Sequence, residues 1–545
     1  MAVLMLTLFL CLMTGSVFVV EGGDPTIFFT WNVTYDTISP LGVPQQGILI
    51  NGEFSGPNIN STTNSNVVVN VFNNLDEPFL ITWNGIQQRK NPWQDGTAGT
   101  NCPILPGKNY TYHIQVKDQI GSYILRVNSR LLIPVPYPDP ADDYTLLVGD
   151  FFNKGHKSLK KILDSGRNLG RCDGVHLNGK VAKGDGKDEP LFTMEAGKTY
   201  KYRICNVGLK TAINVRFQNH QMKLVEMEGS HTMQNEYKSL DVHVGQCFAV
   251  LVKADQDPED YYVVASTRFT RRQVTATGII RYKTGKGPAS SELPPPPVAS
   301  AARPNPQGSY KYGAINITRT IKLANTAGEV DGKLRYALHG VSHDNEFKTP
   351  LKLAEYFNVA KKEFEYDTIP DNPPEKTETI QVKPIVLNIT HRHFVEIIFE
   401  NHKTAIQSYH LSGYSFFAVA CFSGVALLIW VLSVASAIET GTWSPEKRKN
   451  YNLLDAVSRH TIQMFPKSWA AILLTFDNCG MWNIRSEVWD RFYLGQQLYD
   501  RFYLGQQLYV SVLSPNLSTK DEYNIPEDAQ LCGDVIGLPK PKPYT

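Results

Sequence analysis

The sequence has little net charge, few stretches of helical periodicity and none of the short motifs of the common enzyme classes. Its 54 Lys and Arg residues are almost balanced by 52 Asp and Glu, which leaves a formal net charge of +2. So small a charge argues against nucleic acid as the main partner. No GxGxxG, P-loop, GxSxG or HExxH motif occurs, so the enzyme classes that depend on them lack sequence support. Paired carboxylates of the glycosidase type stay open, because their pairing is spatial.

Amphipathic helical patterns are scarce, whereas short β-type runs recur along the chain. Turn residues are frequent, with 33 Pro and 40 Gly, and the alternating Val, Ile, Tyr and Phe content of the runs fits strands covered on one face. The runs are VVVNVFNNL (67–75), YTYHIQVKD (110–118), YTLLVGDFF (144–152), YKYRICNVG (200–208), CFAVLVKAD (247–255), YYVVAST (261–267) and FVEIIFEN (394–401). Strands without intervening helices predict an all-β protein with antiparallel sheets. Its 545 residues exceed what one core supports, so two to four domains are expected.

Several features indicate a secreted protein. The apolar run MAVLMLTLFLCLMTGSVFVV, followed by polar residues, predicts a signal peptide over residues 1–23, although it lacks the usual N-terminal Lys or Arg. The alternative is an uncleaved membrane anchor. Six Asn-x-Ser/Thr sequons favour a glycoprotein; they lie at Asn32, Asn60, Asn109, Asn316, Asn388 and Asn516. An oxidising compartment permits disulfides, and seven cysteines outside the signal leave at least one unpaired.

Two segments in the C-terminal half look inserted. DRFYLGQQLY (490–499) is repeated without change at 500–509, and because solenoid repeats are longer, a duplication or an assembly error is favoured. CFSGVALLIWVLSVASA (421–437) lies in an uncharged span, 416–438, that is long enough to cross a bilayer. The basic residues at 447–449 would then place the C-terminus in the cytosol, which would put the Asn516 sequon and Cys532 on the reducing side. A translated intron fragment therefore fits better than a transmembrane helix, and we expect the third domain's core to be disturbed.

Several longer stretches resemble a known family. WNVTYDTISPLGVPQQGILINGEFSGPNIN (31–60), WQDGTAGTNCPILPG (93–107) and DNCGMW (477–482) are similar to plant multicopper oxidases. EKRKNYNLLDAVSRHT (446–461) and FYLGQQLY narrow the resemblance to the L-ascorbate oxidase homologues called skewed-type or monocopper oxidase-like proteins, including a pollen-specific group.

The resemblance implies three tandem cupredoxin-like domains, each a Greek-key β-sandwich. We expect them at residues 24–140, 141–289 and 309–535, with a proline-rich linker at 290–308 and a tail at 536–545. The resemblance also implies a disulfide between Cys102 and Cys532. Cys205 and Cys247 lie in two strand-like runs and either pair or are simply core residues, whereas Cys172 and Cys479 are not assigned.

Such oxidases hold copper through pairs of histidines and one cysteine thiolate, and the first two ligand motifs fail in this chain. Where the family has His-Trp-His-Gly, the sequence reads Thr82-Trp83-Asn84-Gly85. The next His-x-His should follow residues 121–123, but the motif and roughly a strand beyond it are missing near residue 124.

The last two motifs are also degenerate. The third keeps only His410, with Gln407 and Ser412 at its other ligand positions. In the fourth, Arg485, Ser486 and Glu487 replace His-Cys-His, and Arg491 stands near the last ligand position. Hydroxyls and amides are poor copper ligands, so we expect no metal site and interpret His410 as a structural histidine.

These observations predict a secreted glycoprotein of the apoplast, cell wall or outer plasma-membrane surface that has lost its copper ligands. The resemblance implies a non-enzymatic role in directed cell expansion or pollen-tube growth, through an unidentified wall polysaccharide or surface protein. No cofactor is expected, and copper enters by family analogy only. The alternative is a copper-dependent, ascorbate-oxidase-like oxidoreductase with residual copper.

Two further groups of side chains are weaker candidates. His391 and His393 could face the same way on a strand, but no other metal ligand is evident nearby, so an exposed strand end is the simpler interpretation. The acidic stretch KADQDPEDYY could bind calcium weakly, although a solvated hairpin turn is its default interpretation.

Overall fold

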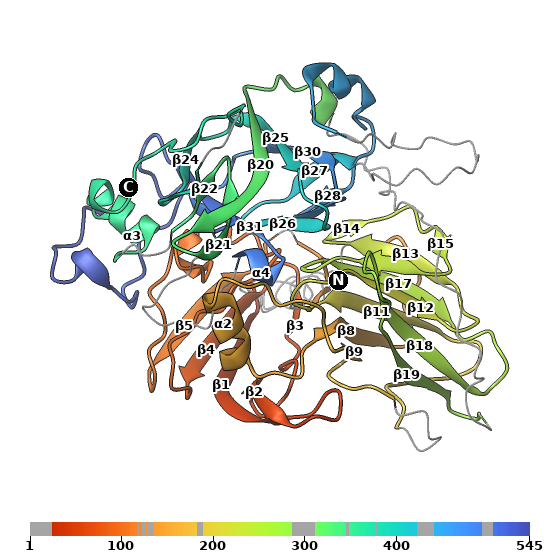
Figure 1. Ribbon diagram of the computed structural model, residues 1–545. Coiled ribbons are helices and arrows are strands. Elements are labelled where there is room, and N and C mark those ends of the chain that lie inside the picture. Colours follow the sequence, from red (N-terminus) through yellow and green to blue (C-terminus); the bar gives the residue numbers. More distant parts are fainter. Residues whose placement is uncertain are drawn as a thin grey trace, which may run out of the picture.

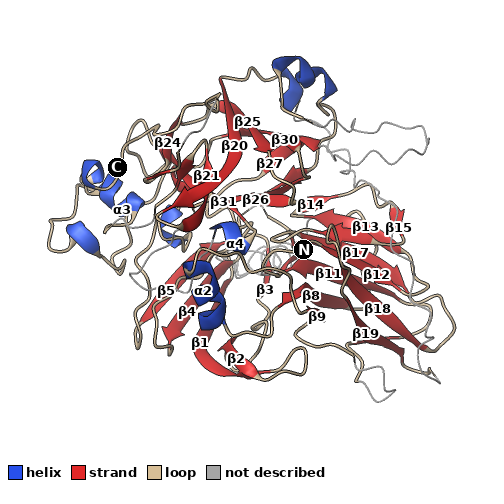
Figure 2. Cartoon of the chain, viewed as in Figure 1, coloured by secondary structure: helices blue, strands red, loops and turns tan. Residues whose placement is uncertain are grey.

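The structure is a computed structural model that describes residues 24–117, 119–122, 126–128, 135–182, 189–285, 311–344, 348–375, 379–421, 441–492 and 505–545. Three β-sandwich domains follow one another along these residues and meet around a common centre (Figure 1). Strands make up most of each domain, and the few helices lie outside the sheets (Figure 2). The predicted all-β class is confirmed. The predicted signal peptide and proline-rich linker lie outside the described residues.

Domain 1 has a main sheet in the order β2-β1-β4-β5 and a smaller sheet in the order β3-β7-β6. The strands are β1 (Thr26–Ile38), β2 (Gln45–Ile50), β3 (Asn60–Thr62), β4 (Asn66–Asn73), β5 (Asn109–Gln115), β6 (Gly121–Ser122) and β7 (Arg126–Asn128), with a 3-10 turn η1 at Pro92–Gln94. Buried and half-buried residues alternate along β4, because successive strand side chains point to opposite faces. Val67, Val69 and Val71 are thereby fully buried in the core. The place near residue 124 where the second ligand motif is missing lies outside the described residues.

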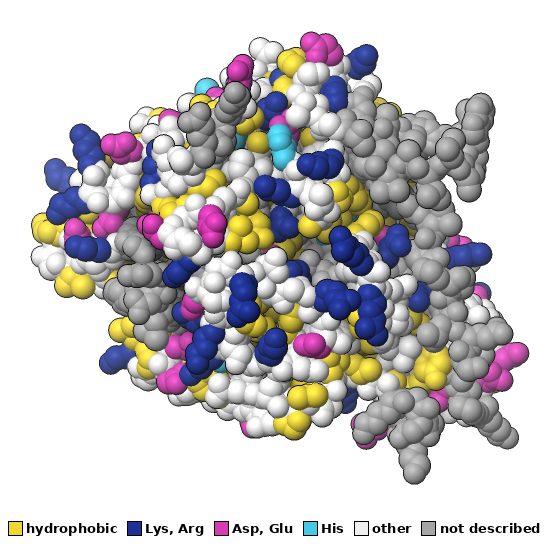
Figure 3. Space-filling model, in the orientation of Figure 1, with side chains coloured by type: hydrophobic (Ala, Val, Ile, Leu, Met, Phe, Trp, Pro, Cys, Tyr) yellow, Lys and Arg dark blue, Asp and Glu magenta, His cyan; other side chains and the backbone are white. Residues whose placement is uncertain are grey.

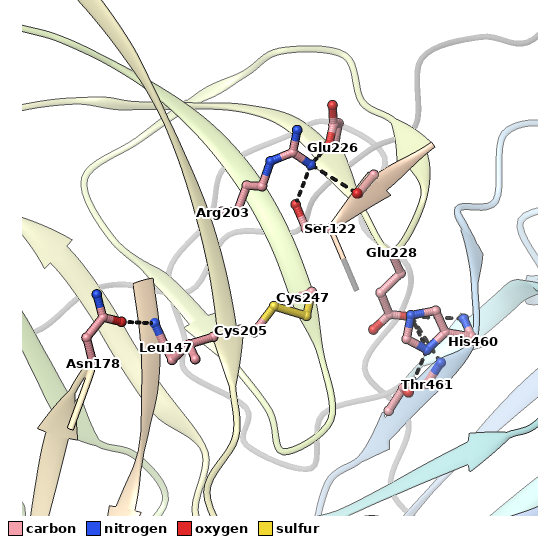
Figure 4. The surroundings of a disulfide bond; sticks show 11 residues. Ser122, Leu147, Asn178, Arg203, Cys205, Glu226, Glu228, Cys247, His460 and Thr461 are labelled. Carbon is pink, nitrogen blue, oxygen red and sulfur yellow. Dashed lines mark hydrogen bonds and ion pairs between the residues drawn. A yellow bond between two sulfur atoms is a disulfide. The ribbon is translucent and has the colours of Figure 1, made fainter. Parts of the chain in front are cut away.

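Domain 2 packs a sheet in the order β10-β19-β18-β12-β16 against one in the order β14-β13-β17-β11-β8-β9. The elements are β8 (Asp143–Phe151), α2 (His156–Asp164), β9 (Gly174–Leu177), β10 (Phe192–Met194), β11 (Thr199–Asn206), β12 (Ile213–Phe217), β13 (Met222–Met227), β14 (Ser230–His231), β15 (Glu236–Tyr237), β16 (Leu240–Val242), β17 (Cys247–Lys253), β18 (Asp260–Thr267) and β19 (Thr275–Tyr282). Cys205 and Cys247 are directly opposite each other on β11 and β17 and form a disulfide (Figure 4). The sequence left open whether Cys205 and Cys247 pair or are simply core residues, and the structure shows that they pair.

Domain 3 packs a sheet in the order β23-β22-β21-β20-β25-β30-β27-β28 against one in the order β24-β32-β31-β26-β29. Its strands are β20 (Arg319–Val330), β21 (Lys333–Leu338), β22 (Val341–Ser342), β23 (Gln381–Val382), β24 (Val386–Thr390), β25 (Phe394–Asn401), β26 (Gln407–Leu411), β27 (Phe416–Cys421), β28 (Ser458–Arg459), β29 (Thr461–Met464), β30 (Ser468–Thr475), β31 (Gly480–Ser486) and β32 (Gln507–Leu513). Its helices are α3 (Leu351–Tyr356) and α4 (Trp489–Phe492), and its 3-10 turns are η2 (Tyr312–Ala314), η3 (Ala360–Lys362), η4 (Pro445–Asn450) and η5 (Gly533–Val535).

The apolar insertion leaves and re-enters domain 3 at one end of a strand. Residues 422–440 lie outside the described residues, but Cys421 pairs with Ala470 and the N–H of Gly441 donates to the carbonyl of Lys467 at 2.9 Å. Both flanks therefore meet the beginning of β30. Residues 416–421, the start of the apolar span, form strand β27. In the described ranges, no helix combines the length and the hydropathy that a membrane crossing requires.

The two residues that flank the central part of the tandem repeat are also hydrogen-bonded to each other. The N–H of Gln506 donates to the carbonyl of Arg491 at 3.1 Å, so the two ends of residues 493–504, which lie outside the described residues, are adjacent. The expected disturbance of the third core is wrong, because one continuous cluster that includes Ile397, Ile472 and Trp482 is buried. When the two ends of an inserted segment lie side by side, the strands before and after it can pair as they would without the insertion.

The residues after β32, 514–545, which we call the C-terminal tail from this point on, are tied back to domain 1. Cys102 and Cys532 form the disulfide that the resemblance implied, with a sequence separation of 430 residues. Apolar side chains pack around this bond, among them Trp93, Leu353 and Val535. Cys172 and Cys479 are in no disulfide of the described residues, and burial raises the pKa of their thiols to about 11 and about 12.

Candidate functional site

The degenerate ligand positions divide into two groups because strand side chains alternate between two faces. Tyr409 on β26 and Ile484 on β31 point into the domain 3 core. The neighbouring His410 and Arg485 therefore point the other way, toward the junction of the domains. Gln407 and Ser486 share the core-facing side. We call these sets the junction cluster and the interior cluster; the junction cluster consists of Thr82, Asn84, Asp95, Glu228, His410, Ser412, His460, Arg485 and Glu487, and the interior cluster of Gln407, Tyr409, Ser486, Arg491 and Gln506.

Arg485 is the centre of the junction cluster. Its Nε lies 3.2 Å from Oε1 of Glu487, and the Arg485 side chain is only 3% exposed. Its Nη1 donates to Oγ of Ser412 at 3.3 Å, and its Nη2 donates to Oδ1 of Asn84. Asn84 comes from domain 1, so one guanidinium joins two strands of domain 3 to a loop of another domain.

Asn84 is itself held on both sides. Its Nδ2 donates to both carboxylate oxygens of Glu487 at 3.4 Å, and Oγ1 of Thr82 donates to its Oδ1 at 3.3 Å. The nearby Trp83 is buried in the domain 1 core and packs against Trp31, with ring centroids 5.7 Å apart. Thr82 and Asn84 are therefore placed by the packing of the residue between them.

The positive charge of Arg485 acts on two buried carboxyl groups, those of Glu487 and Asp95. Burial raises the pKa of Glu487, which the charge of Arg485 opposes. Burial also raises the pKa of Asp95 to about 6, again against the opposing charge of Arg485. One cation thus faces two buried acids, and desolvation holds part of the acid population in the neutral form at mildly acidic pH.

His410 lies beside a second imidazole, that of His460. Their ring centroids are 5.3 Å apart in an edge-to-face arrangement, and Oγ1 of Thr461 lies within hydrogen-bond distance of Nδ1 of both rings, at 3.2 and 3.0 Å. Burial lowers the pKa of both histidines, and the charge of Arg485 lowers it further. Both imidazoles are therefore neutral at ordinary pH.

Glu228, from the turn between β13 and β14, closes this side of the cluster. Its Oε2 accepts the backbone N–H groups of His460 and Thr461 at 2.9 and 3.0 Å (Figure 4). Its Oε1 lies 3.5 Å from Nη2 of Arg459. Sequence reasoning missed Glu228, His460 and Asp95 as members. His460 and Asp95 lie inside the stretches that carry the resemblance, whereas no signal in the sequence distinguishes Glu228.

The interior cluster is buried and poorly hydrogen-bonded. Gln407, Ser486, Arg491 and Gln506 are all less than one tenth exposed. Both side-chain polar atoms of Gln407 and of Gln506 lack a hydrogen-bond partner among the described residues, as do Nε and Nη1 of Arg491. The guanidinium of Arg491 is instead placed over the ring of Tyr336, at 5.2 Å from the centroid, with Asp490 at 3.8 Å.

The remaining sequence candidates lie apart from these clusters. His391 and His393 occupy the turn between β24 and β25, and the acidic stretch connects β17 to β18, where Asp260 pairs with Arg281 at 2.8 Å. Among the residues described, no three His, Cys, Asp or Glu side chains are grouped so as to hold a metal ion. All six sequon asparagines are exposed.

Replacing Asp95 with asparagine is expected to stabilise the protein by about 1–3 kcal/mol at pH 7 and to have little effect at pH 4, since a pKa shift of one unit corresponds to about 1.4 kcal/mol. The folded-state pKa of about 6 lies above the ordinary value of 3.8, so the wild-type loses stability as the pH rises between these values. The neutral amide does not titrate and avoids that loss. Urea unfolding at both pH values measures the effect. Asp257→Asn, at an exposed turn position, is the matched control, and equal destabilisation by Asp95→Asn at both pH values would contradict the prediction.

Comparisons with known proteins agree with this architecture. Three models described as multicopper oxidase match residues 32–129, 142–285 and 348–507. The chain is 62% identical to an L-ascorbate oxidase homolog of Brassica napus, with 98% of each chain covered. It is 42% identical to the monocopper oxidase-like protein SKU5 of Arabidopsis thaliana, with 95% of this chain and 91% of that protein covered.

Solved structures show the same fold at low sequence identity. The multicopper oxidase Fet3p, which functions in iron import, superposes with a TM-score of 0.71 at 17% identity, covering 89% of this chain and 90% of that one. A laccase from Botrytis aclada gives 0.70 at 19% identity, covering 90% and 89%. The three matched models together with the two close relatives establish that the chain belongs to the multicopper oxidase family.

Proposed function

We propose that this chain is a secreted member of the family that has lost its copper ligands and acts without copper redox chemistry. Its role would be that of a cell-wall or cell-surface glycoprotein in directed cell expansion or pollen-tube growth, acting by binding. The observation that carries the proposal is the position of Arg485, which stands among the degenerate ligand positions and is bonded to Asn84, Ser412 and Glu487.

The donor chemistry of the junction cluster supports the loss of copper. A redox copper centre requires several imidazoles, and a type 1 site also requires a thiolate. Apart from the imidazole of His410 and the carboxylate of Glu487, the ligand positions of this cluster provide a hydroxyl from Thr82 and Ser412, an amide from Asn84 and the guanidinium of Arg485. A guanidinium is always cationic and has no lone pair to donate. A fixed positive charge also repels a copper ion. The residues present therefore do not fit a redox copper, and no step of a copper reaction is derived from them.

The interior cluster supports the same conclusion. Ser486 takes the position of the thiolate, Gln407 stands at a ligand position of the third motif, and Arg491 stands near the last ligand position of the fourth. Within the described part of the chain, the cysteines not in disulfides are Cys172 and Cys479, whose thiol pKa values burial raises well above neutrality. Neither supplies a thiolate at ordinary pH.

The surface chemistry is consistent with secretion. Six exposed sequon asparagines are available to a glycosylating pathway. Two disulfides, Cys102–Cys532 and Cys205–Cys247, are of a kind that persists in oxidising compartments. Both features fit the apoplast better than a reducing compartment.

Copper analysis tests the proposal. Protein secreted from a eukaryotic host grown with added copper is expected to contain less than about one copper per chain and to lack the blue absorption of a copper–thiolate bond. It is also expected to consume no oxygen with ascorbate or a phenol. Stoichiometric copper together with oxygen consumption would overturn the proposal in favour of a copper-dependent oxidoreductase. A relative named L-ascorbate oxidase, from Cucumis sativus, is 27% identical over 87% of this chain.

A further inference from the structure

The connection between β8 and β9 concentrates positive charge. Its residues 154–171, KGHKSLKKILDSGRNLGR, include six Lys or Arg and one Asp, a formal net charge of +5, whereas the whole chain carries +2. The rest of the chain is therefore slightly acidic. This connection also contains α2, a helix of nine residues in a protein built mainly of strands. The charge is thus a local property of one segment.

Packing fixes the orientation of this segment. Leu159 and Leu163 lie on one side of α2 and join a cluster that includes Tyr336 and Trp489 of domain 3. Lys157 and Lys161 lie on the other side and are exposed, because residues four apart share a helix face. The helix is therefore anchored by its apolar side, and its lysines are held outward.

Five exposed basic residues make up what we call the basic face: Lys154, Lys157, Lys161, Arg167 and Arg171. Lys157 forms an ion pair with Asp76 at 2.8 Å. No ion pair of the described residues involves any of the other four. Figure 3 shows Lys and Arg side chains gathered over α2 and the surface beside it. Four of the five charges are thus available to an external anion.

The segment that carries the basic face is packed against domain 3. A Cβ at Gly166 would lie 3.0 Å from Cα of Lys333, so the loop after α2 lies directly against the β20–β21 hairpin. A second contact joins domains 2 and 3 nearby, since the backbone N–H of Trp489 donates to the carbonyl of Leu209 at 2.7 Å and both residues belong to the apolar cluster under α2. Charges held on a fixed scaffold lose less conformational entropy on binding than charges on a loose loop.

Two absences on this surface distinguish between kinds of anion. None of the large hydrophobic side chains exposed in the described part of the chain falls within 154–171, so the face offers no apolar anchor for a membrane. The sequence also has no sequon between Asn109 and Asn316, so no N-glycan attaches to the segment itself. The surface suits a hydrophilic, extended polyanion.

We propose that the basic face is a docking surface for an acidic, carboxylate-bearing polysaccharide. This inference rests on the proposed function, because the extracellular, wall-facing location makes such a polymer available. It names the chemical class of a partner that the proposed function leaves open. Binding would be electrostatic, with the lysine and arginine side chains lying along the carboxylates of the polymer and releasing their counterions.

Binding to polygalacturonate tests the proposal directly. The full-length glycoprotein is expected to bind this polymer at low ionic strength, to lose affinity steeply with added salt, and not to bind its fully methyl-esterified form, which has the same backbone without charge. Replacing Lys154, Lys161, Arg167 and Arg171 together with glutamine is expected to weaken binding on the order of a hundredfold, taking about fivefold per basic residue near an anionic surface with some loss to solvent exposure.

The matched control removes the same charge elsewhere. Lys108, Lys253, Lys311 and Lys520 are exposed, and their joint replacement by glutamine is expected to change the affinity less than about threefold. Equal losses in both variants, equal binding to the esterified polymer, or binding only to vesicles containing phosphatidylserine would each overturn the proposal. A protein that binds polygalacturonate through this face yet contains redox copper would support the docking surface and refute the proposed function. A copper-free protein that fails to bind would do the reverse.

Discussion

Replacing Arg485 with methionine is expected to destabilise the protein by about 3–5 kcal/mol at pH 7, the usual cost of removing one partner from a buried ionic network. The methionine side chain keeps an unbranched apolar stem but is shorter, and the substitution removes the cation shared by Asn84, Ser412 and Glu487. Glu487 and Asp95 then remain buried without a compensating charge. Chemical denaturation followed by tryptophan fluorescence measures the loss.

The loss should depend on pH in a predictable direction. Without Arg485 the folded-state pKa of Glu487, already raised by burial, rises further above its unfolded value. An acid whose pKa is raised by folding binds its proton more tightly in the folded state, so its penalty is absent at low pH and grows as the pH rises past the unfolded pKa. Arg485→Met is therefore expected to cost less at pH 5 than at pH 7.

Two further variants separate charge from shape. Arg485→Lys keeps the charge but not the planar fork that reaches several acceptors, so its loss should be smaller, at about 1–2 kcal/mol. Adding Glu487→Gln to Arg485→Met removes one uncompensated acid and should restore part of the stability. Arg485→Met unfolding at the wild-type denaturant concentration at pH 7 would show that the guanidinium does not hold the junction together.

The strands were largely predictable because their sequence signals are local, whereas the three-domain arrangement was implied by the family resemblance. The alternation along 67–75 and 200–208 predicted the strands that the structure shows as β4 and β11. The pairing of Cys205 with Cys247 stayed open in the sequence, since it depends on the register between β11 and β17. The expectation of a disturbed third core failed for a related reason, because sequence alone does not show that the two ends of an insertion meet beside one strand.

The site was predictable only as a set of positions. The resemblance placed Asn84, Ser412, Arg485 and Glu487 at ligand positions, and the structure brings these four together. It did not indicate that Arg485 would bond to the other three, because these contacts depend on how the strands and domains pack. Asn84 lies 401 residues from Arg485 in the chain and Ser412 lies 73 residues away. Glu228 comes from yet another domain, and its role is fixed by backbone N–H groups that carry no sequence signal.

Removing the Cys102–Cys532 disulfide by replacing both cysteines with serine is expected to destabilise the protein by about 4–5 kcal/mol, because the bond closes a very long loop in the unfolded chain. The sequence separation is 430 residues. The bond also holds the tail against domain 1, where it is packed between Trp93 and Val535. Denaturation of the non-reduced double variant measures the loss, and hydrogen exchange of residues 522–535 reports whether the tail detaches first.

The Cys205–Cys247 disulfide provides the matched comparison, because it closes a separation of only 42 residues inside one sheet. Loop-closure entropy grows with the logarithm of loop length, so a tenfold shorter loop should contribute about 2 kcal/mol less. The corresponding double serine variant should therefore be the more stable of the two and should leave hydrogen exchange in the tail unchanged. If both variants lose the same stability, contacts in the folded state outweigh chain entropy, and the Cys102–Cys532 bond fastens a tail that the apolar cluster around it already holds in place.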